Sequence, residues 1–178
     1  MKFIRSRSVV FSFIASSAIG LFLAQSFAAD EKKPAAAQGQ VDSIVKSYLV
    51  VQKALAADKT EGVSEELAKI HTAATALTES GDAKIKEQAK ALAGHSDVKV
   101  KDLKGARVSF KPLSADVIAL VQILPPSAEV APELYEVNCP MVKANWLQPS
   151  KDVANPYMGS EMLDCGKIEK KIASAEKK

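Results

Sequence analysis

Residues 103–124 read LKGARVSFKPLSADVIALVQIL, and this stretch decides the fold. Its apolar side chains recur at alternating intervals of three and four residues, the spacing of one face of an α-helix. They are Leu103, Ala106, Phe110, Leu113, Val117, Leu120 and Leu124. A face this regular is typical of a helix that packs against other helices. Pro112 predicts a kink or a break in it, because proline removes one helical hydrogen bond.

Three further helices are expected upstream of this stretch. Apolar residues follow helical spacing within residues 41–55, 64–77 and 85–92, with a glycine near the end of each segment. Four helices joined by short connections most simply form an antiparallel bundle, here over residues 40–125.

The chain changes character after the bundle. Six of its eight prolines lie between positions 125 and 156, and the helical spacing disappears. This composition predicts that residues 126–168 form an ordered, loop-rich cap, with a turn at Asn155-Pro156 and a short extended piece at residues 134–137. The predicted fold class is all-α: an antiparallel four-helix bundle with a C-terminal Cys/Met cap. Residues 169–178 predict a solvated, charged tail.

The N-terminus predicts export. Three basic residues and no acid precede an apolar run from Val9 to Leu23, and Ser26-Phe27-Ala28 offers a cleavage site. Residues 1–28 are thus expected to be a signal peptide, and residues 29–39 a disordered lead-in. The run holds about 15 residues, fewer than the roughly 20 that a membrane span needs. We therefore expect a periplasmic protein without a stable membrane anchor.

Charge and motifs exclude several functional classes. The chain has 24 basic and 21 acidic residues, and the expected signal peptide removes three basic ones, which leaves the remainder balanced. This balance is unlike the basic surface of a nucleic-acid-binding protein. The sequence lacks Cys-x-x-Cys, Gly-x-Ser-x-Gly, His-Glu-x-x-His and phosphate-loop motifs. We therefore expect a binding protein and no enzyme.

Residues 138–166 read NCPMVKANWLQPSKDVANPYMGSEMLDCG and hold every sulfur side chain except that of Met1. Thiolate and thioether sulfurs are the ligands that soft ions such as Cu(I) prefer. The sequence predicts a Cu(I) or Ag(I) site with four sulfur ligands, one reserve ligand and two shielding aromatic residues. The ligands are Cys139, Met141, Met162 and Cys165, with Met158 in reserve; the shielding residues are Trp146 and Tyr157.

A structural disulfide is the alternative for the same residues. Exported proteins retain disulfides, and Cys139 and Cys165 are the only cysteines. A bridge between them would stabilise the fold by about 3.5 kcal/mol through loop closure. The protein would then be a structural or adaptor module that docks a partner protein, and its methionines would be core residues.

The cap also resembles a known family. The resemblance rests on Cys-Pro-Met, Trp-Leu, Asn-Pro-Tyr-x-Gly and Met-Leu-x-Cys-Gly segments, and on two helical segments upstream. These are residues 139–141, 146–147, 155–159, 162–166, 48–58 and 110–114. They are similar to a bacterial exported domain of unknown function, found alone or fused to periplasmic adaptors of heavy-metal (copper/silver) efflux pumps. The resemblance implies a helical periplasmic domain linked to metal export, with such an adaptor or another periplasmic protein as partner.

Overall fold

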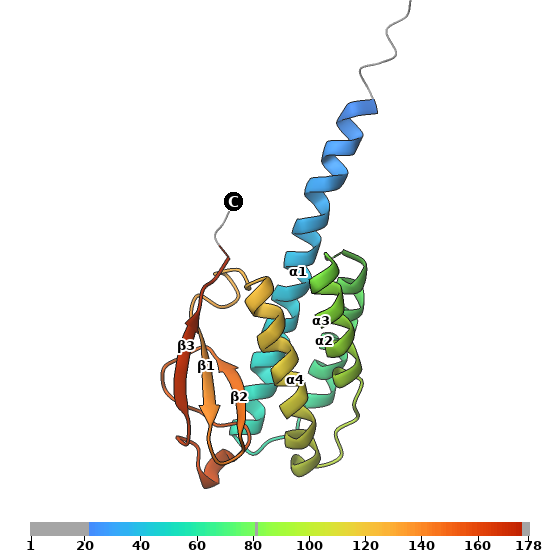
Figure 1. Ribbon diagram of the computed structural model, residues 1–178. Coiled ribbons are helices and arrows are strands. Elements are labelled where there is room, and N and C mark those ends of the chain that lie inside the picture. The colour runs from blue at the N-terminus through green and yellow to red at the C-terminus, as the bar shows by residue number, and fades with distance from the viewer. Residues whose placement is uncertain (1–21, 81, 176–178) are drawn as a thin grey trace, which may run out of the picture.

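Four helices pack into a bundle in the computed structural model, which describes residues 22–80 and 82–175, with side chains from residue 35 onward. The helices are α1 (Phe22–Ala56), α2 (Val63–Ser80), α3 (Ala83–Ser96) and α4 (Leu103–Ile123). Each helix packs on the one before it, and α4 also packs on α1 (Figure 1). The prediction of four helices is confirmed.

Helix α1 is longer than the sequence pattern predicted. It begins at Phe22, so residues 29–39 are helical and do not form the expected disordered lead-in. Alanine and lysine make up six of these eleven residues, and both favour helix. The first turns of α1 project beyond the bundle (Figure 1). Residues 1–21, most of the expected signal peptide, lie outside the described residues.

Helix α4 packs both on the other helices and on the C-terminal region. It begins after Asp102, whose side chain accepts a hydrogen bond from the Gly105 backbone N–H at 2.7 Å and caps the helix. The break predicted at Pro112 does not occur, since α4 continues as one helix through this residue. The apolar face identified in the sequence is buried in the core, from Ala106 to Leu120.

The region beyond the bundle contains a β-sheet, which corrects the all-α prediction. Three antiparallel strands, β1 (Leu134–Cys139), β2 (Ala144–Gln148) and β3 (Lys167–Ile172), lie in the order β2-β1-β3. The sheet stands beside α4, with β2 as the edge nearest the helices (Figure 1). Strand β1 contains the extended piece predicted at residues 134–137. Strand β2 is too short, and β3 too rich in charged residues, for a clear alternating pattern.

Strand β3 also replaces part of the predicted charged tail. Residues 170–172 pair with β1, and Lys170 lies 3.2 Å from the Glu136 carboxylate. Beyond the strand, the Ala175 N–H donates to the Pro126 carbonyl at 2.8 Å. Lysines are common on edge strands because their charge prevents pairing with another chain. A run of lysines therefore looks the same in a sequence whether it is a tail or an edge strand.

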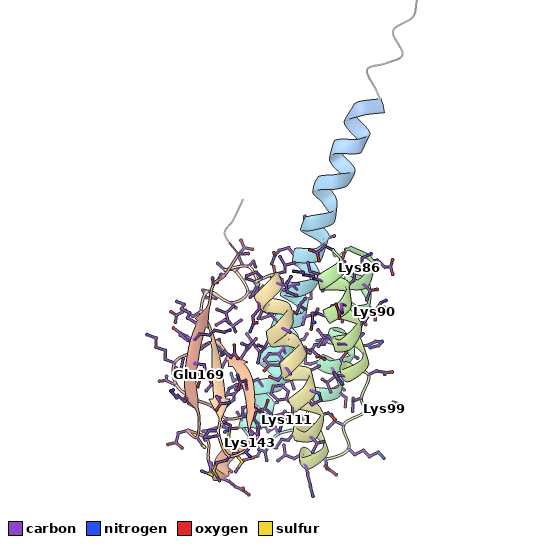
Figure 2. All side chains as sticks on the ribbon, in the orientation of Figure 1. Lys86, Lys90, Lys99, Lys111, Lys143 and Glu169 are labelled. Carbon is purple, nitrogen blue, oxygen red and sulfur yellow. The ribbon has the colours of Figure 1, made fainter. Side chains whose placement is uncertain are left out.

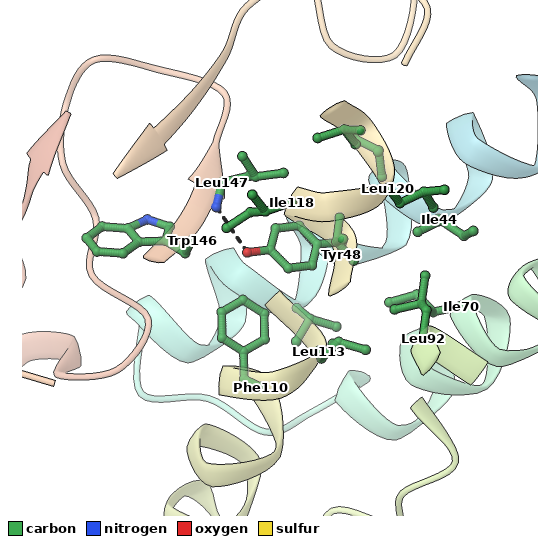
Figure 3. Packing of buried hydrophobic residues seen from close by; sticks show 14 of the residues in the cluster. Ile44, Tyr48, Ile70, Leu92, Phe110, Leu113, Ile118, Leu120, Trp146 and Leu147 are labelled. Carbon is green, nitrogen blue, oxygen red and sulfur yellow. Dashed lines mark hydrogen bonds between the residues drawn. The ribbon is translucent and has the colours of Figure 1, made fainter. Parts of the chain in front are cut away.

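Side chains from the helices bind the free edge of β2. The Tyr48 hydroxyl of α1 accepts a hydrogen bond from the Leu147 N–H at 3.0 Å, and it also contacts the Ser114 hydroxyl (Figure 3). Ser114 of α4 donates to the Asn145 carbonyl at 3.0 Å, and Tyr157 donates to the same oxygen at 2.7 Å. Strand β2 pairs with β1 on one side only. The backbone N–H and C=O groups on its other side thus form hydrogen bonds with buried hydroxyl groups.

Candidate functional site

The five predicted sulfur residues lie on two segments at one end of the sheet. Cys139 ends β1, and Met141 follows in the turn to β2. Met158, Met162 and Cys165 lie on the connection from β2 to β3, which includes a short 3-10 helix, η1 (Gly159–Glu161). Sulfur atoms, drawn in yellow, gather at the end of the sheet near Lys143 (Figure 2). The cluster predicted from sequence is therefore also a cluster in space.

The two cysteines are in direct contact. Both are free thiols, and a side-chain hydrogen bond joins them, in which the Cys165 thiol donates to the Cys139 sulfur. Cys139 is fully buried, whereas Cys165 is partly exposed. The pair is therefore reached from the Cys165 side.

The surroundings of the two thiols affect their pKa values differently. Burial opposes ionisation of Cys139, but hydrogen bonds from the Val142 N–H, the Asn155 side chain, the Met141 N–H and Cys165 lower its pKa overall. Burial raises the pKa of Cys165, and the adjacent Cys139 and Asp164 raise it further. The pKa of Cys139 is thus shifted down and that of Cys165 up.

Asn155 holds the two segments together and is the site residue that sequence reasoning missed. It is fully buried; its amide nitrogen donates to the Cys165 carbonyl at 2.6 Å and also bonds the Cys139 sulfur. Its amide oxygen accepts from the N–H groups of Tyr157 at 2.8 Å and Met158 at 3.2 Å. The Asn-Pro pair indicated a turn, but a turn signal does not reveal which distant groups a side chain binds.

The three methionines of the two segments differ in exposure. Met141 is 67% exposed and Met162 38%, while Met158 is partly buried and packs against the core. An exposed thioether on an unbranched side chain reorients readily. Met141 and Met162 therefore lie at the surface, on the two segments that carry the thiols.

Trp146 and Tyr157 form a wall behind the site. Their rings meet edge to face with centroids 6.0 Å apart, and Phe110 extends the stack from Tyr157 at 5.7 Å. The Trp146 indole N–H donates to Gln148 at 3.0 Å. Gly166, next to Cys165, lies so close to the Trp146 ring that a Cβ there would collide with it. The aromatic residues are buried, as expected of residues that shield the site.

A charged cluster fixes η1 to the helices. The Arg107 side chain donates to Asp58 at 2.6 Å and to the Pro156 carbonyl at 3.0 Å. Asp58 also accepts the Ser160 N–H at 3.0 Å. Hydrogen bonds from Ser160 and then Arg107 lower the pKa of Asp58 to about 2. Gly159 has a φ of 57°, and a Cβ there would collide with both charged side chains, so only glycine fits without strain.

The histidines lie elsewhere. His71 contacts the Ala93 carbonyl at 3.0 Å, and His95 contacts Asp116 at 2.6 Å, both within the bundle. Among the described residues, no group of three or more His, Cys, Asp and Glu side chains is arranged to hold a metal ion. The donors that the structure brings together are thus two thiols, with thioethers at the same end of the sheet.

Comparison with known proteins identifies only the helical part. Residues 44–129 are similar to a family model described as "Protein of unknown function (DUF3347)". No curated protein and no solved structure matches the chain. Within the described residues, no helix has the length and apolarity needed to cross a membrane.

Proposed function

We propose that the protein binds one soft monovalent ion, Cu(I) or Ag(I), between the sulfurs of Cys139 and Cys165. The observation that carries this proposal is the hydrogen bond between the two thiols. A bridging proton and a closed-shell monovalent ion each need two sulfur donors that face one another, and soft ions prefer thiolates. Replacement of thiol protons by the ion would release protons to the solvent.

The groups around Cys139 support the same chemistry. A buried thiolate needs donors to offset its desolvation, and Val142, Met141 and Asn155 supply them. These hydrogen bonds also fix the direction of the sulfur, as outer contacts do at metal sites. Met141 and Met162 would complete a three- or four-coordinate site, with Met158 in reserve. Trp146 and Tyr157 would exclude water from its inner side.

The role that fits such a site is copper or silver buffering in the periplasm, or delivery to an efflux system. The partners would be a heavy-metal efflux adaptor or another periplasmic protein. Two features support transfer to a partner: Cys165 is partly exposed, and Met141 and Met162 are at the surface. A partner bearing soft ligands would reach the ion from this side.

The same contact supports a second function, that of an adaptor with a stapled cap. Two thiols in hydrogen-bonding contact are close enough to oxidise to a disulfide with little movement of the backbone. The cap would then be permanently cross-linked, and partner binding would not depend on metal.

Competition for Cu(I) tests the proposal. The mature protein, reduced under anaerobic conditions, is titrated with Cu(I) in the presence of a chromophoric chelator, and proton release is recorded in weak buffer. We expect one Cu(I) per chain, with release of protons as the two thiols bind it. Cys139→Ser and Cys165→Ser should each lower affinity at least about 100-fold, a difference of about 2.8 kcal/mol. Met141→Leu and Met162→Leu should have smaller effects.

The controls separate loss of ligand from loss of fold. Each variant is compared in thermal unfolding, and the oxidised wild-type protein serves as a chain of identical sequence without thiols. Failure of the reduced protein to compete for Cu(I) would overturn the proposal. Protein isolated from the periplasm with a mass two protons light, no metal and no free thiol would favour the adaptor.

A further inference from the structure

An open groove lies between α4 and the turn that joins β1 to β2. Its volume is about 560 Å³, within the range of small-molecule sites. Four apolar and three basic side chains line it, and no acidic one does. They are Leu103, Val108, Val142, Tyr157, Lys104, Arg107 and Lys111.

The basic side chains come from one face of α4. Lys104, Arg107 and Lys111 are three and four residues apart, so they follow one another along the helix. Asp58 balances the charge of Arg107. Among the described residues, neither Lys104 nor Lys111 has an acidic partner. The groove therefore carries two uncompensated positive charges.

Two of these groups are held in place by the chain itself. Lys111 donates one hydrogen bond to the Val142 carbonyl at 2.9 Å, which leaves its other N–H groups for a ligand. Arg107 is fixed by the carbonyls of Leu55 and Pro156, each at 3.0 Å. Lys111 is labelled on the side of α4 that faces the β1–β2 turn (Figure 2).

The apolar part of the groove lacks a partner in the fold. Val108 is 68% exposed although it lies between the two lysines on α4, and it shares the groove with Leu103. Contact with an apolar ligand would remove this surface from water, which is favourable by about 25 cal/mol per Å². Cations beside exposed apolar side chains match a ligand that is both apolar and anionic.

We propose that this groove binds a small organic anion with an apolar body, such as a medium-chain carboxylate. Its carboxylate would lie between Lys104 and Lys111, and its chain would cover Val108 and Leu103. The groove contains neither thiol and does not depend on metal binding, although Val142 and Tyr157 border both sites. Each proposal can therefore fail without the other.

Calorimetric titration of the mature protein with decanoate, below its critical micelle concentration, tests the groove. Decanol and decyltrimethylammonium serve as neutral and cationic probes of the same chain length. We expect saturable binding of decanoate, at least about tenfold tighter than that of either matched probe. Equal affinity for all three probes, or no saturable binding of decanoate, would overturn the proposal.

Reversing the charge of a lysine in the groove tests whether decanoate binds there. Lys104→Glu should weaken decanoate binding about tenfold or more, because Lys104 makes no contact on which the fold depends. Lys90→Glu on α3 is the matched control and should leave affinity unchanged (Figure 2). Val108→Asp should weaken binding through loss of apolar contact and added repulsion. Equal effects of the two lysine variants would place the ligand elsewhere and overturn the proposal, as would binding to anionic vesicles without binding of free decanoate.

Discussion

The helical bundle and the sheet beside it are held together by different forces. At the centre of the bundle, side chains such as Ile44, Ile70 and Leu92 are buried without any polar partner (Figure 3). At the junction with the sheet, buried hydroxyl groups of Tyr48 and Ser114 bind backbone groups of β2. Apolar packing needs only the right size and spacing, whereas a buried hydrogen-bond network requires particular atoms at particular positions.

This difference matters for the candidate site. The thiols lie on the sheet and on the segment from β2 to β3, beyond the bundle. Asn155 and the Arg107–Asp58 pair orient that segment through directed hydrogen bonds. Loss of apolar volume in the bundle should therefore lower global stability, while loss of a polar contact at the junction should also disturb the thiols.

The largest expected effect is that of Trp146→Ala. Removal of this fully buried ring should lower the free energy of unfolding by about 3–5 kcal/mol. It should also speed the reaction of Cys139 with a thiol reagent under native conditions, since the ring forms the inner wall of the site. Urea unfolding and timed alkylation measure the two effects.

Leu92→Ala is the matched change in the bundle. It should cost about 2–5 kcal/mol but leave the rate of thiol alkylation near that of the wild type. If Leu92→Ala accelerated alkylation as much as Trp146→Ala, the two regions would open together and the contrast between them would be lost.

Next in size is Tyr48→Phe. The change keeps the ring but leaves the Leu147 N–H without its partner in a buried position, which should cost about 1–3 kcal/mol. Urea unfolding of Tyr48→Phe, Ser114→Ala and the double variant measures their coupling, expected at about 0.5–3 kcal/mol. Additive effects would show that the two hydroxyls act independently.

A smaller and more local effect is expected for Gly159→Ala. Alanine at a positive φ, next to Asp58 and Arg107, should cost about 1–2 kcal/mol. Gly94→Ala in α3 is the control, because a Cβ there meets nothing within 4 Å and alanine favours helix; it should stabilise by about 0.5–1 kcal/mol. Thermal unfolding distinguishes them by sign, and the same sign for both would contradict the steric argument.

The smallest expected effect is the acid dependence contributed by Asp58. Its folded-state pKa of about 2 lies below the ordinary aspartate value, so its contribution to stability is complete above about pH 4. That contribution should disappear as the pH falls towards 2. Asp58→Asn should therefore flatten the loss of stability between about pH 4 and pH 2. An unchanged profile, measured by urea unfolding at each pH, would show that the contacts of Asp58 with Ser160 and Arg107 are not retained in solution.

The sulfur residues of the candidate site were predictable from the sequence, but the contacts between them and with Asn155 were not. Sulfur composition alone identified Cys139 and Cys165, and their contact follows from the pairing of β1 with β3, which brings the ends of both strands together. Asn155 gave only a turn signal, although it bonds both segments. Its role depends on atoms from distant parts of the chain, for which a single sequence carries no local pattern.

The sequence by itself determined the four helices, because apolar residues at intervals of three and four define a buried face from local information alone. It also determined which sulfur atoms belong to one short stretch. Only the tertiary structure decided that three strands within residues 134–172 form a sheet and that the two thiols contact each other. Strand pairing depends on partners far apart in the chain. Strand β2 is short and β3 is mostly charged, and both are supported by hydroxyl groups and salt bridges of their neighbours.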